Sequence, residues 1–393
     1  MYESNNQNID SAIFSSIGAA WQWAIDNASL HPKWIEETAA DLGLSELSLI
    51  EIYKRLLDQG KPAAEIREEL KAQAAQVAES DKEEYSKITA GYNLQSFRDE
   101  IAKAADEERC STGFKNLDEA LDGGLYRGLY IIGAVPSLGK TTFVLQIADQ
   151  IAKQGKDVLI VSLEMDRAEL TAKSLSRISF ELVRKCDKKG MAKTARDILD
   201  GSRQKNFIAE EIALLDQSFD LYGQFADHVY IIEGRGNFTV NEIRAAVEKH
   251  VSITGNAPVV IIDYIQKISA LNLNASDKTS MDLAVKELFW TARDFNLPVI
   301  GISSFNRAKY TGRPDMSAFK ESGSIEYDAD VLLAMNLKGS AADGYNDQAA
   351  KQKDPREVEI SVLKNRLASV GKVLKYDYYA AYNSFIEDGV VNS

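Results

Sequence analysis

Hydrophobic residues follow two different spacings along this chain, and the spacing changes near residue 110. Before that point, residues 11–88 contain no strand-like run, and segments such as LSLIEIYKRLLDQG place apolar side chains at helical intervals. The segments AAEIREELKAQAAQVAES and SFRDEIAKAADEER follow with the same helical pattern. The sequence therefore predicts a small all-helical N-terminal domain over residues 1–92 and a connecting helix over residues 93–110.

After residue 110, short apolar runs rich in β-branched residues alternate with longer amphipathic stretches. The runs lie at 129–133, 157–163, 228–234, 257–265, 298–303, 330–336 and 358–365. Most of them are continuously apolar, as expected for strands that helices cover on both faces. The pattern predicts an α/β domain over residues 111–393, in which a mostly parallel central sheet lies between two layers of helices.

Composition narrows the class of protein further. A content of 45% hydrophobic and 27% charged residues is typical of a soluble globular chain. The sequence shows no run of apolar residues long enough to span a membrane, and its N-terminus lacks the pattern of a signal peptide, so we expect a cytoplasmic protein. The two cysteines and three histidines are scattered, which argues against a disulfide framework or a zinc site.

The negative charge is concentrated at one end of the chain. Residues 1–110 contain 21 acidic and 11 basic residues, whereas the remainder contains 38 and 35. A nearly balanced C-terminal part can still present a local basic loop to phosphate groups. The net charge of −13 therefore does not exclude a nucleic-acid partner.

The stretch AVPSLGKTT, residues 134–142, matches the phosphate-binding loop, although Ala134 stands where glycine is usual. It follows an apolar strand and opens an amphipathic helix, so that backbone N–H groups and the helix N-terminus face the phosphates. Lys140 is expected to reach the β- and γ-phosphates and Thr141 to ligate Mg²⁺. The predicted cofactors are ATP and Mg²⁺, and the predicted nucleotide-binding residues are Ala134, Ser137, Gly139, Lys140, Thr141 and Thr142.

Two carboxylates complete the predicted chemistry. Asp263 ends the apolar run VVIID, where a magnesium-binding acid is expected. Glu164 ends VLIVSLE, and if that strand neighbours the strand of the phosphate loop, its carboxylate can orient the attacking water. The alternative for Glu164 is a structural role at the start of the helix DRAELTAKSL.

The segments AVPSLGKTT, VSLEM, VVIIDYIQ, ISSFNR, FKESGSIEYDAD and VLKNR occur in this order. Through them, residues 111–380 resemble the ATPase domain of DnaB-type replicative helicases, and ESGSIE followed by DAD is the most specific part. The resemblance implies a RecA-like three-layer sandwich. It also implies that Lys140 and Thr141 bind phosphate and Mg²⁺, that Asp263 is the Walker B acid, and that Glu164 is the catalytic glutamate.

The same resemblance implies partners. Lys364 and Arg366 of KNR match the pair that reaches into the neighbouring subunit's site, with Arg366 as the arginine finger, so a homo-oligomeric and hexameric ring is expected. Lys320, Glu321 and Gly323 match the loop that holds the phosphates of single-stranded DNA. Without the resemblance, the KNR segment would be interpreted as a solvated strand end, and the segment from Lys320 to Gly323 as a flexible surface loop. A primase or a helicase loader is a further possible partner.

Two features depart from the family. Where the family has a glutamine that senses the γ-phosphate, this chain has Ser304, which is shorter and leaves the coupling between ATP state and DNA grip weakened or rewired. The N-terminal region shows no match to the family's helical dimerisation domain. Residues 93–110 are nevertheless compatible with a linker helix that docks on the adjacent subunit, and the chain is also compatible with one piece of a primase–helicase fusion.

The leading hypothesis is therefore a ring-shaped, ATP-driven DNA helicase that acts in replication and has no membrane association. The alternative is a RecA-fold ATPase whose nucleotide state controls assembly on DNA or on a partner without processive unwinding, which Ser304 motivates. A small-molecule phosphotransferase is disfavoured, since it has no use for a DNA loop or for a finger supplied by another subunit.

Overall fold

A computed structural model describes residues 14, 16–106, 109–186, 189–271, 274–306, 312, 314–319, 323–340, 342 and 345–388. The chain divides into two compact units, Met1–Glu108 and Arg109–Ser393. The first unit includes most of the segment that the sequence assigns to a linker helix, and that role stays a prediction. Among the described residues, no helix combines the length and the apolar character that a membrane span needs.

The first unit is helical throughout its described part. Its helices are α1 (Ile17–Ala28), α2 (Pro32–Asp41), α3 (Glu46–Asp58), α4 (Ala63–Ser86) and α5 (Leu94–Asp106). Ser16 and Ser45 cap α1 and α3 by accepting hydrogen bonds from first-turn N–H groups. The apolar positions at helical spacing, including Leu49, Ile50 and Tyr53, form a fully buried core with α1, α2 and α4.

The second unit alternates strands and helices. Its strands are β1 (Gly128–Ala134), β2 (Val158–Ser162), β3 (Val229–Glu233), β4 (Val259–Asp263), β5 (Pro298–Ser304), β6 (Val331–Leu337), β7 (Arg356–Asn365), β8 (Val373–Tyr379) and β9 (Ser384–Glu387). Its α-helices are α6 (Lys115–Ala120), α7 (Lys140–Ala152), α8 (Arg167–Arg184), α9 (Ala195–Leu199), α10 (Gly201–Gln204), α11 (Ala209–Gly223), α12 (Val240–Thr254), α13 (Asp277–Asp294), α14 (Gly323–Asp328) and α15 (Asp347–Gln352). Single turns include η1 (Lys189–Met191), η2 (Ala226–His228), η3 (Ile265–Lys267), η5 (Met316–Phe319) and η6 (Ala380–Tyr382).

Within the described residues, the strands form one sheet in the order β3-β2-β4-β5-β1-β6-β7-β8-β9. The strands from β3 to β6 in this order are parallel, and β7, β8 and β9 join antiparallel. Every residue of β1, β2 and β4 is buried, as their continuous apolar runs predict. The predicted mostly parallel, helix-covered sheet is confirmed.

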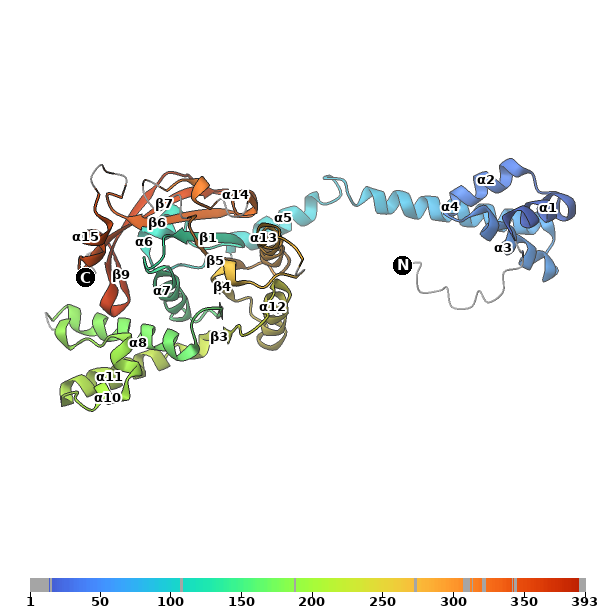
Figure 1. The fold of residues 1–393 in the computed structure, drawn as a ribbon. Coiled ribbons are helices and arrows are strands. Elements are labelled where there is room, and N and C mark those ends of the chain that lie inside the picture. The colour runs from blue at the N-terminus through green and yellow to red at the C-terminus, as the bar shows by residue number, and fades with distance from the viewer. Residues whose placement is uncertain are drawn as a thin grey trace. The chain divides into compact units, whose positions relative to one another are not determined.

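Helices cover both faces of the sheet, and α7 lies on the opposite face from α12 and α13 (Figure 1). The alternating side chains of β1 show the division, because Tyr130 and Ile132 pack with α7 while Leu129 and Ile131 pack with α12 and α13. Strands β8 and β9 were not predicted. Charged and polar residues interrupt their apolar runs, and buried and more exposed positions alternate along β8.

A buried ion pair fixes the helix of the phosphate loop to α8. The guanidinium of Arg177 on α8 bonds the carboxylate of Asp149 on α7, and the two side chains are 2% and 0% exposed. Arg177 also bonds Glu181 through Nη1 at 2.9 Å. Because charges are costly to bury alone, this pair makes the position of α7 depend on α8.

We expect Arg177→Ala to lower the free energy of unfolding of the full chain by about 3–5 kcal/mol, because it leaves the Asp149 carboxylate buried without its partner. Urea denaturation measures the effect. Arg203→Ala is the matched control, since the pair of Arg203 with Asp197 is 43% and 23% exposed and should contribute less than about 1 kcal/mol. Equal losses in the two variants would contradict the prediction.

Candidate functional site

The loop between β1 and α7 has a backbone that only certain residues allow. Ser137 and Gly139 have φ of 64° and 90°, in the left-handed region. A Cβ on Gly139 would lie 2.8 Å from the ring of Tyr378, so this position combines an unusual φ with no space for a side chain. Any residue other than glycine is therefore disfavoured at this position, which is the N-cap of α7.

Ala134, the unusual first residue of the loop, lies in the middle of the sheet. It pairs with Ser304 of β5 on one side and Met335 of β6 on the other, and its methyl group is fully buried in the core. Its carbonyl oxygen accepts a hydrogen bond from Lys140 Nζ at 3.0 Å. Burial lowers the pKa of Lys140 to about 8, although the charges of Asp263 and Glu164 oppose that shift.

Asp263 ends β4 beside this lysine and is 3% exposed. Burial raises the pKa of its carboxyl group and the Glu164 carboxylate adds to the rise, whereas the Thr141 hydroxyl, Lys140 and Lys173 oppose it. Among the described residues, Asp263 Oδ2 is buried without a hydrogen-bond partner. A carboxylate oxygen of this kind next to a threonine hydroxyl is a set of hard oxygen donors, so the residues present fit Mg²⁺.

Glu164 follows β2. Its predicted role assumed that β2 neighbours β1, and this assumption is wrong. β2 does not neighbour β1, because β4 and β5 lie between them. The carboxylate still influences Lys140 and Asp263 electrostatically, since the carboxyl ends of parallel strands share one edge of the sheet. The Ser162 hydroxyl accepts from the N–H of Met165 and donates to its carbonyl oxygen, which braces the turn that carries Glu164.

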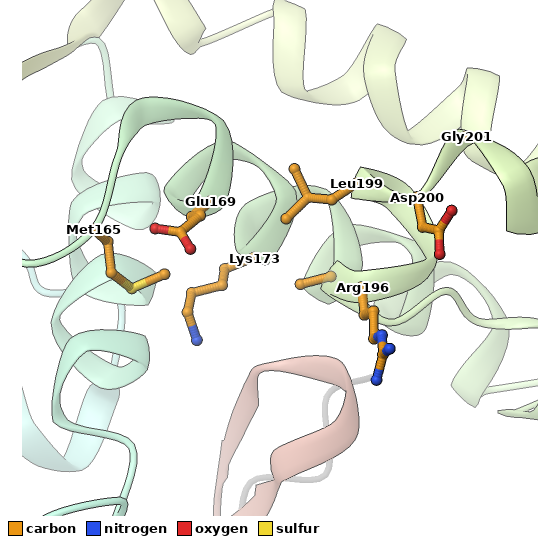
Figure 2. A pocket seen from close by; sticks show the side chains of 8 residues that line it. Met165, Glu169, Lys173, Arg196, Leu199, Asp200 and Gly201 are labelled. Carbon is orange, nitrogen blue, oxygen red and sulfur yellow. The ribbon is translucent and has the colours of Figure 1, made fainter.

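Lys173 is a cation of this site that the sequence did not reveal. Its Nζ lies 3.0 Å from Asn383 Oδ1 and 3.5 Å from the Thr142 hydroxyl, and burial lowers its pKa. It also lines a cavity of about 510 Å³ between α8 and the short helices α9 and α10 (Figure 2). A single lysine on an amphipathic helix belongs to no recognisable sequence motif. Only the packing of α8 on α7 places Lys173 beside Thr142.

Lys364 and Arg366 do not join this cluster. Asn365, between them, is in register with Val331, whereas Ala134 is in register with Met335. Four residues of strand separate these levels, which is roughly 13 Å along the strand direction. Lys364 Nζ donates to the Glu326 carbonyl oxygen at 2.7 Å, and Arg366 bonds the Tyr327 carbonyl oxygen and Asp330. Both cations therefore lie at the opposite edge of the sheet from the phosphate loop.

The remaining predicted residues lie at or beyond the end of β5. Ser304 is the last residue of that strand, beside Ala134. Gly323 is the first residue of α14, and the N–H of the next residue, Ser324, donates to Asp282. Lys320 and Glu321 lie outside the described residues, so their expected role with DNA stays a prediction.

We expect Gly139→Ala to weaken nucleotide binding at least tenfold, because a left-handed φ costs a residue with a Cβ about 1–2 kcal/mol and Tyr378 must also move. Equilibrium titration with a fluorescent ATP analogue measures the affinity. Gly155→Ala is the control, since Gly155 has a φ of 73° and nothing lies within 4 Å of the place that a Cβ would take. A similar loss of affinity in both variants would refute the role of the loop.

Several known proteins are similar to this chain in sequence. The family described as DnaB-like helicase C terminal domain matches residues 110–387. A probable replicative DNA helicase of Trieres chinensis is 29% identical over 288 residues, which cover 70% of this chain and 57% of that protein. The replicative DNA helicase DnaC of Bacillus subtilis is 30% identical over 280 residues, covering 70% and 56%. The alignments thus span little more than half the length of these relatives.

Solved structures share the fold. One structure, described as an ATPase domain, superposes with a TM-score of 0.62 at 24% identity, covering 76% of this chain and 99% of that one. A DnaB-like replicative helicase, solved in a study of its interactions with primase, gives the same TM-score and identity and covers 87% and 78%. The RecA-like fold expected from the resemblance is confirmed, and by the family match the chain belongs to the DnaB-like helicase C-terminal domain family.

Proposed function

We propose that this chain is an ATP-dependent, ring-forming DNA helicase, which hydrolyses ATP at subunit interfaces to move along single-stranded DNA and separate the duplex during replication. The observation that carries the proposal is the separation of the site into two parts. Lys140, Thr141, Asp263 and Glu164 gather at one edge of the sheet, whereas Lys364 and Arg366 lie at the other. In this proposal, a second copy of the chain completes the site.

The gathered residues divide the work of hydrolysis. The N–H groups of loop residues 137–142 bind the phosphates, and Lys140 leaves the Ala134 carbonyl oxygen to reach the β- and γ-phosphates. Thr141 and Asp263 would hold Mg²⁺, which would supply positive charge against the charge that develops on the phosphate oxygens. Glu164, half exposed at the mouth of the site, orients the attacking water and accepts its proton.

The two cations of β7 serve the neighbouring subunit. Arg366 is 40% exposed and Lys364 is partly exposed, so both can reach another chain once they leave their present partners. Those partners are the Asp330 carboxylate and carbonyl oxygens at the end of α14, whose first residue is Gly323. In this proposal, α14 connects the finger to the segment at residues 320–323, which is expected to hold phosphates of single-stranded DNA by charge and backbone N–H groups.

The helix α5 is proposed as the linker that docks on a neighbouring subunit. Leu94, Phe97 and Ile101 repeat at helical spacing, and each is more than half exposed. Such an apolar stripe needs a partner surface. We further propose a hexameric ring and a primase as an additional partner, because a structure of the same fold is described together with its interactions with primase.

One observation favours a second candidate function. Ser304 ends β5 where the family places its sensor glutamine, and a nucleotide-controlled assembly ATPase does not need that sensor. In this alternative, nucleotide drives oligomer formation on DNA or on a partner, and a duplex with a single-stranded tail stays paired. Strand separation in a fluorescence assay distinguishes the two functions.

We expect single-stranded DNA to stimulate ATP hydrolysis and Arg366→Ala to reduce turnover about a thousandfold or more while nucleotide binding persists. Steady-state hydrolysis over protein concentrations that span assembly measures both effects. Arg293→Ala is the matched control, because Arg293 bonds the same Asp330 oxygen at 3.1 Å yet is not part of the proposed finger. Hydrolysis that ignores both DNA and Arg366 would argue against the helicase.

Mixing two inactive variants tests whether the finger acts between subunits. Glu164→Gln removes the proton acceptor and Arg366→Ala removes the finger, so each variant alone should be inactive. In mixed rings, some interfaces combine an intact Glu164 with an intact Arg366 of the neighbour, and hydrolysis should partly return. A mixture as inactive as its components would place Arg366 and Glu164 in the same subunit's site.

A further inference from the structure

On the side that faces β4, the end of β5 is held by a side chain rather than by a strand. The backbone pairing of β4 with β5 joins Val260, Ile261 and Ile262 to Val299, Ile300 and Gly301, and it stops there. The last residues of β5, Ser303 and Ser304, extend beyond this pairing on the β4 side. They remain paired with β1 on the other side, where Ala134 begins the phosphate loop.

Gln266 supplies hydrogen bonds to β5 where the pairing of β5 with β4 stops. It belongs to η3, the single turn that follows Asp263, and its Nε2 donates to the Ser303 hydroxyl at 2.8 Å and to the Ser304 carbonyl oxygen at 3.3 Å. The Ser304 N–H donates in return to Gln266 Oε1 at 3.4 Å. The amide thus bonds both the donor and the acceptor of the Ser304 backbone, as a neighbouring strand would.

On its other side, the turn η3 contacts Glu164, the carboxylate proposed to orient the attacking water. Lys267, the next residue, forms an ion pair with Glu164 at 3.9 Å between Nζ and Oε1. Ile265, the preceding residue, is fully buried, and its side chain would lie 2.9 Å from a Cβ on Gly301. The turn η3 thus contacts Glu164 through Lys267 and the end of β5 through Gln266, and Ile265 anchors it in the core.

Beyond Ser304 the chain leaves the sheet through two anchored residues. Phe305 N–H donates to the Ala134 carbonyl oxygen at 3.1 Å, and Asn306 N–H donates to the Ala318 carbonyl oxygen at 2.9 Å. The rings of Phe305 and Phe319 pack edge to face at 5.3 Å, and both would clash with any Cβ on Gly133. The segment proposed to contact DNA begins directly after Phe319.

We infer that Gln266 is a positioning residue, which couples the nucleotide site to the proposed DNA-contacting segment and serves where Ser304 replaces the family's sensor glutamine. This inference rests on the proposed function. Nucleotide that engages Glu164 and Asp263 shifts η3, and Gln266 carries the shift to Ser303 and Ser304. Phe305 and the turn η5, which packs against it, move with them. Ser304 takes part in this link through its backbone N–H and carbonyl groups, so the link does not require a long side chain at this position.

Hydrogen–deuterium exchange of the full chain tests the link without DNA. We expect Mg²⁺ and a non-hydrolysable ATP analogue to change exchange over residues 303–306 about tenfold in the wild type. In Gln266→Met, which keeps the side-chain length but not the hydrogen bonds, that change should fall below about twofold, while protection of residues 134–142 persists. Gln266→Glu keeps an acceptor for the Ser304 N–H and should retain part of the change.

Each outcome of this experiment bears on the inference. Protection at 134–142 without any change at 303–306 in the wild type would overturn it, and so would a full change in Gln266→Met. Loss of protection at both places in Gln266→Met would show a merely structural role and also overturn it. No protection at 134–142 in the wild type would defeat the proposed function itself, which keeps the two failures distinct.

The hydrolysis reaction gives a second, independent readout. Gln266→Met should lower the stimulation of hydrolysis by single-stranded DNA about tenfold and leave DNA-free hydrolysis within about twofold of wild type. Gln154→Met is the matched control, because Gln154 lies just after the far end of α7 and its amide likewise bonds backbone groups, the carbonyl oxygens of Ser111 and Gln150. Equal stimulation in Gln266→Met and wild type would contradict the inference.

Discussion

The site depends on the burial of opposite charges at the carboxyl edge of the central strands. Lys140 and Asp263 are both largely withdrawn from water, and neither charge is stable there without the other or a ligand. The sheet imposes this arrangement, since β1 and β4 end at the same edge and the helix α7 starts between them. Nucleotide phosphates can pair with the lysine and Mg²⁺ with the carboxylate, and this explains why the site is suited to both.

The sheet also divides the proposed catalytic residues into two groups. Parallel strands place Lys140, Asp263 and Glu164 at one edge, while the antiparallel β7 ends at the other and leaves Lys364 and Arg366 there. A site built from both sets needs two copies, which makes the proposed hydrolysis a property of an assembly. The same two cations bond carbonyl oxygens near the end of α14, the helix that begins at Gly323 of the segment proposed to hold DNA.

The proposed link through Gln266 rests on the hydrogen bonds between this side chain and the end of β5. Ser304 stands where the resemblance predicts a sensor glutamine, and the amide that bonds its backbone comes instead from the turn after Asp263. Its neighbour Lys267 pairs with Glu164, so a single turn of three residues contacts both the proposed water-orienting carboxylate and the end of β5. Side chains that bridge diverging strands are natural points of control, because the backbone no longer fixes them.

The sequence by itself determined the class of fold and the residues of the phosphate loop. Continuous apolar runs predicted buried strands, and AVPSLGKTT after such a run predicted a helix N-terminus that faces phosphate. These features depend on neighbours in sequence, which is why pattern alone revealed them. The same holds for Asp263 at the end of its strand. Pattern missed β8 and β9, since charged residues interrupt their apolar positions.

Only the tertiary structure decided which residues meet. The order of strands placed β4 and β5 between β1 and β2, and it brought Glu164 to the phosphate loop across that distance. The packing of α8 brought Lys173 beside Thr142, and the end of the β4–β5 pairing gave Gln266 its partners. Such contacts join residues that lie far apart in the sequence. Local periodicity cannot predict them, because it indicates that a residue is buried but not which residues bury it.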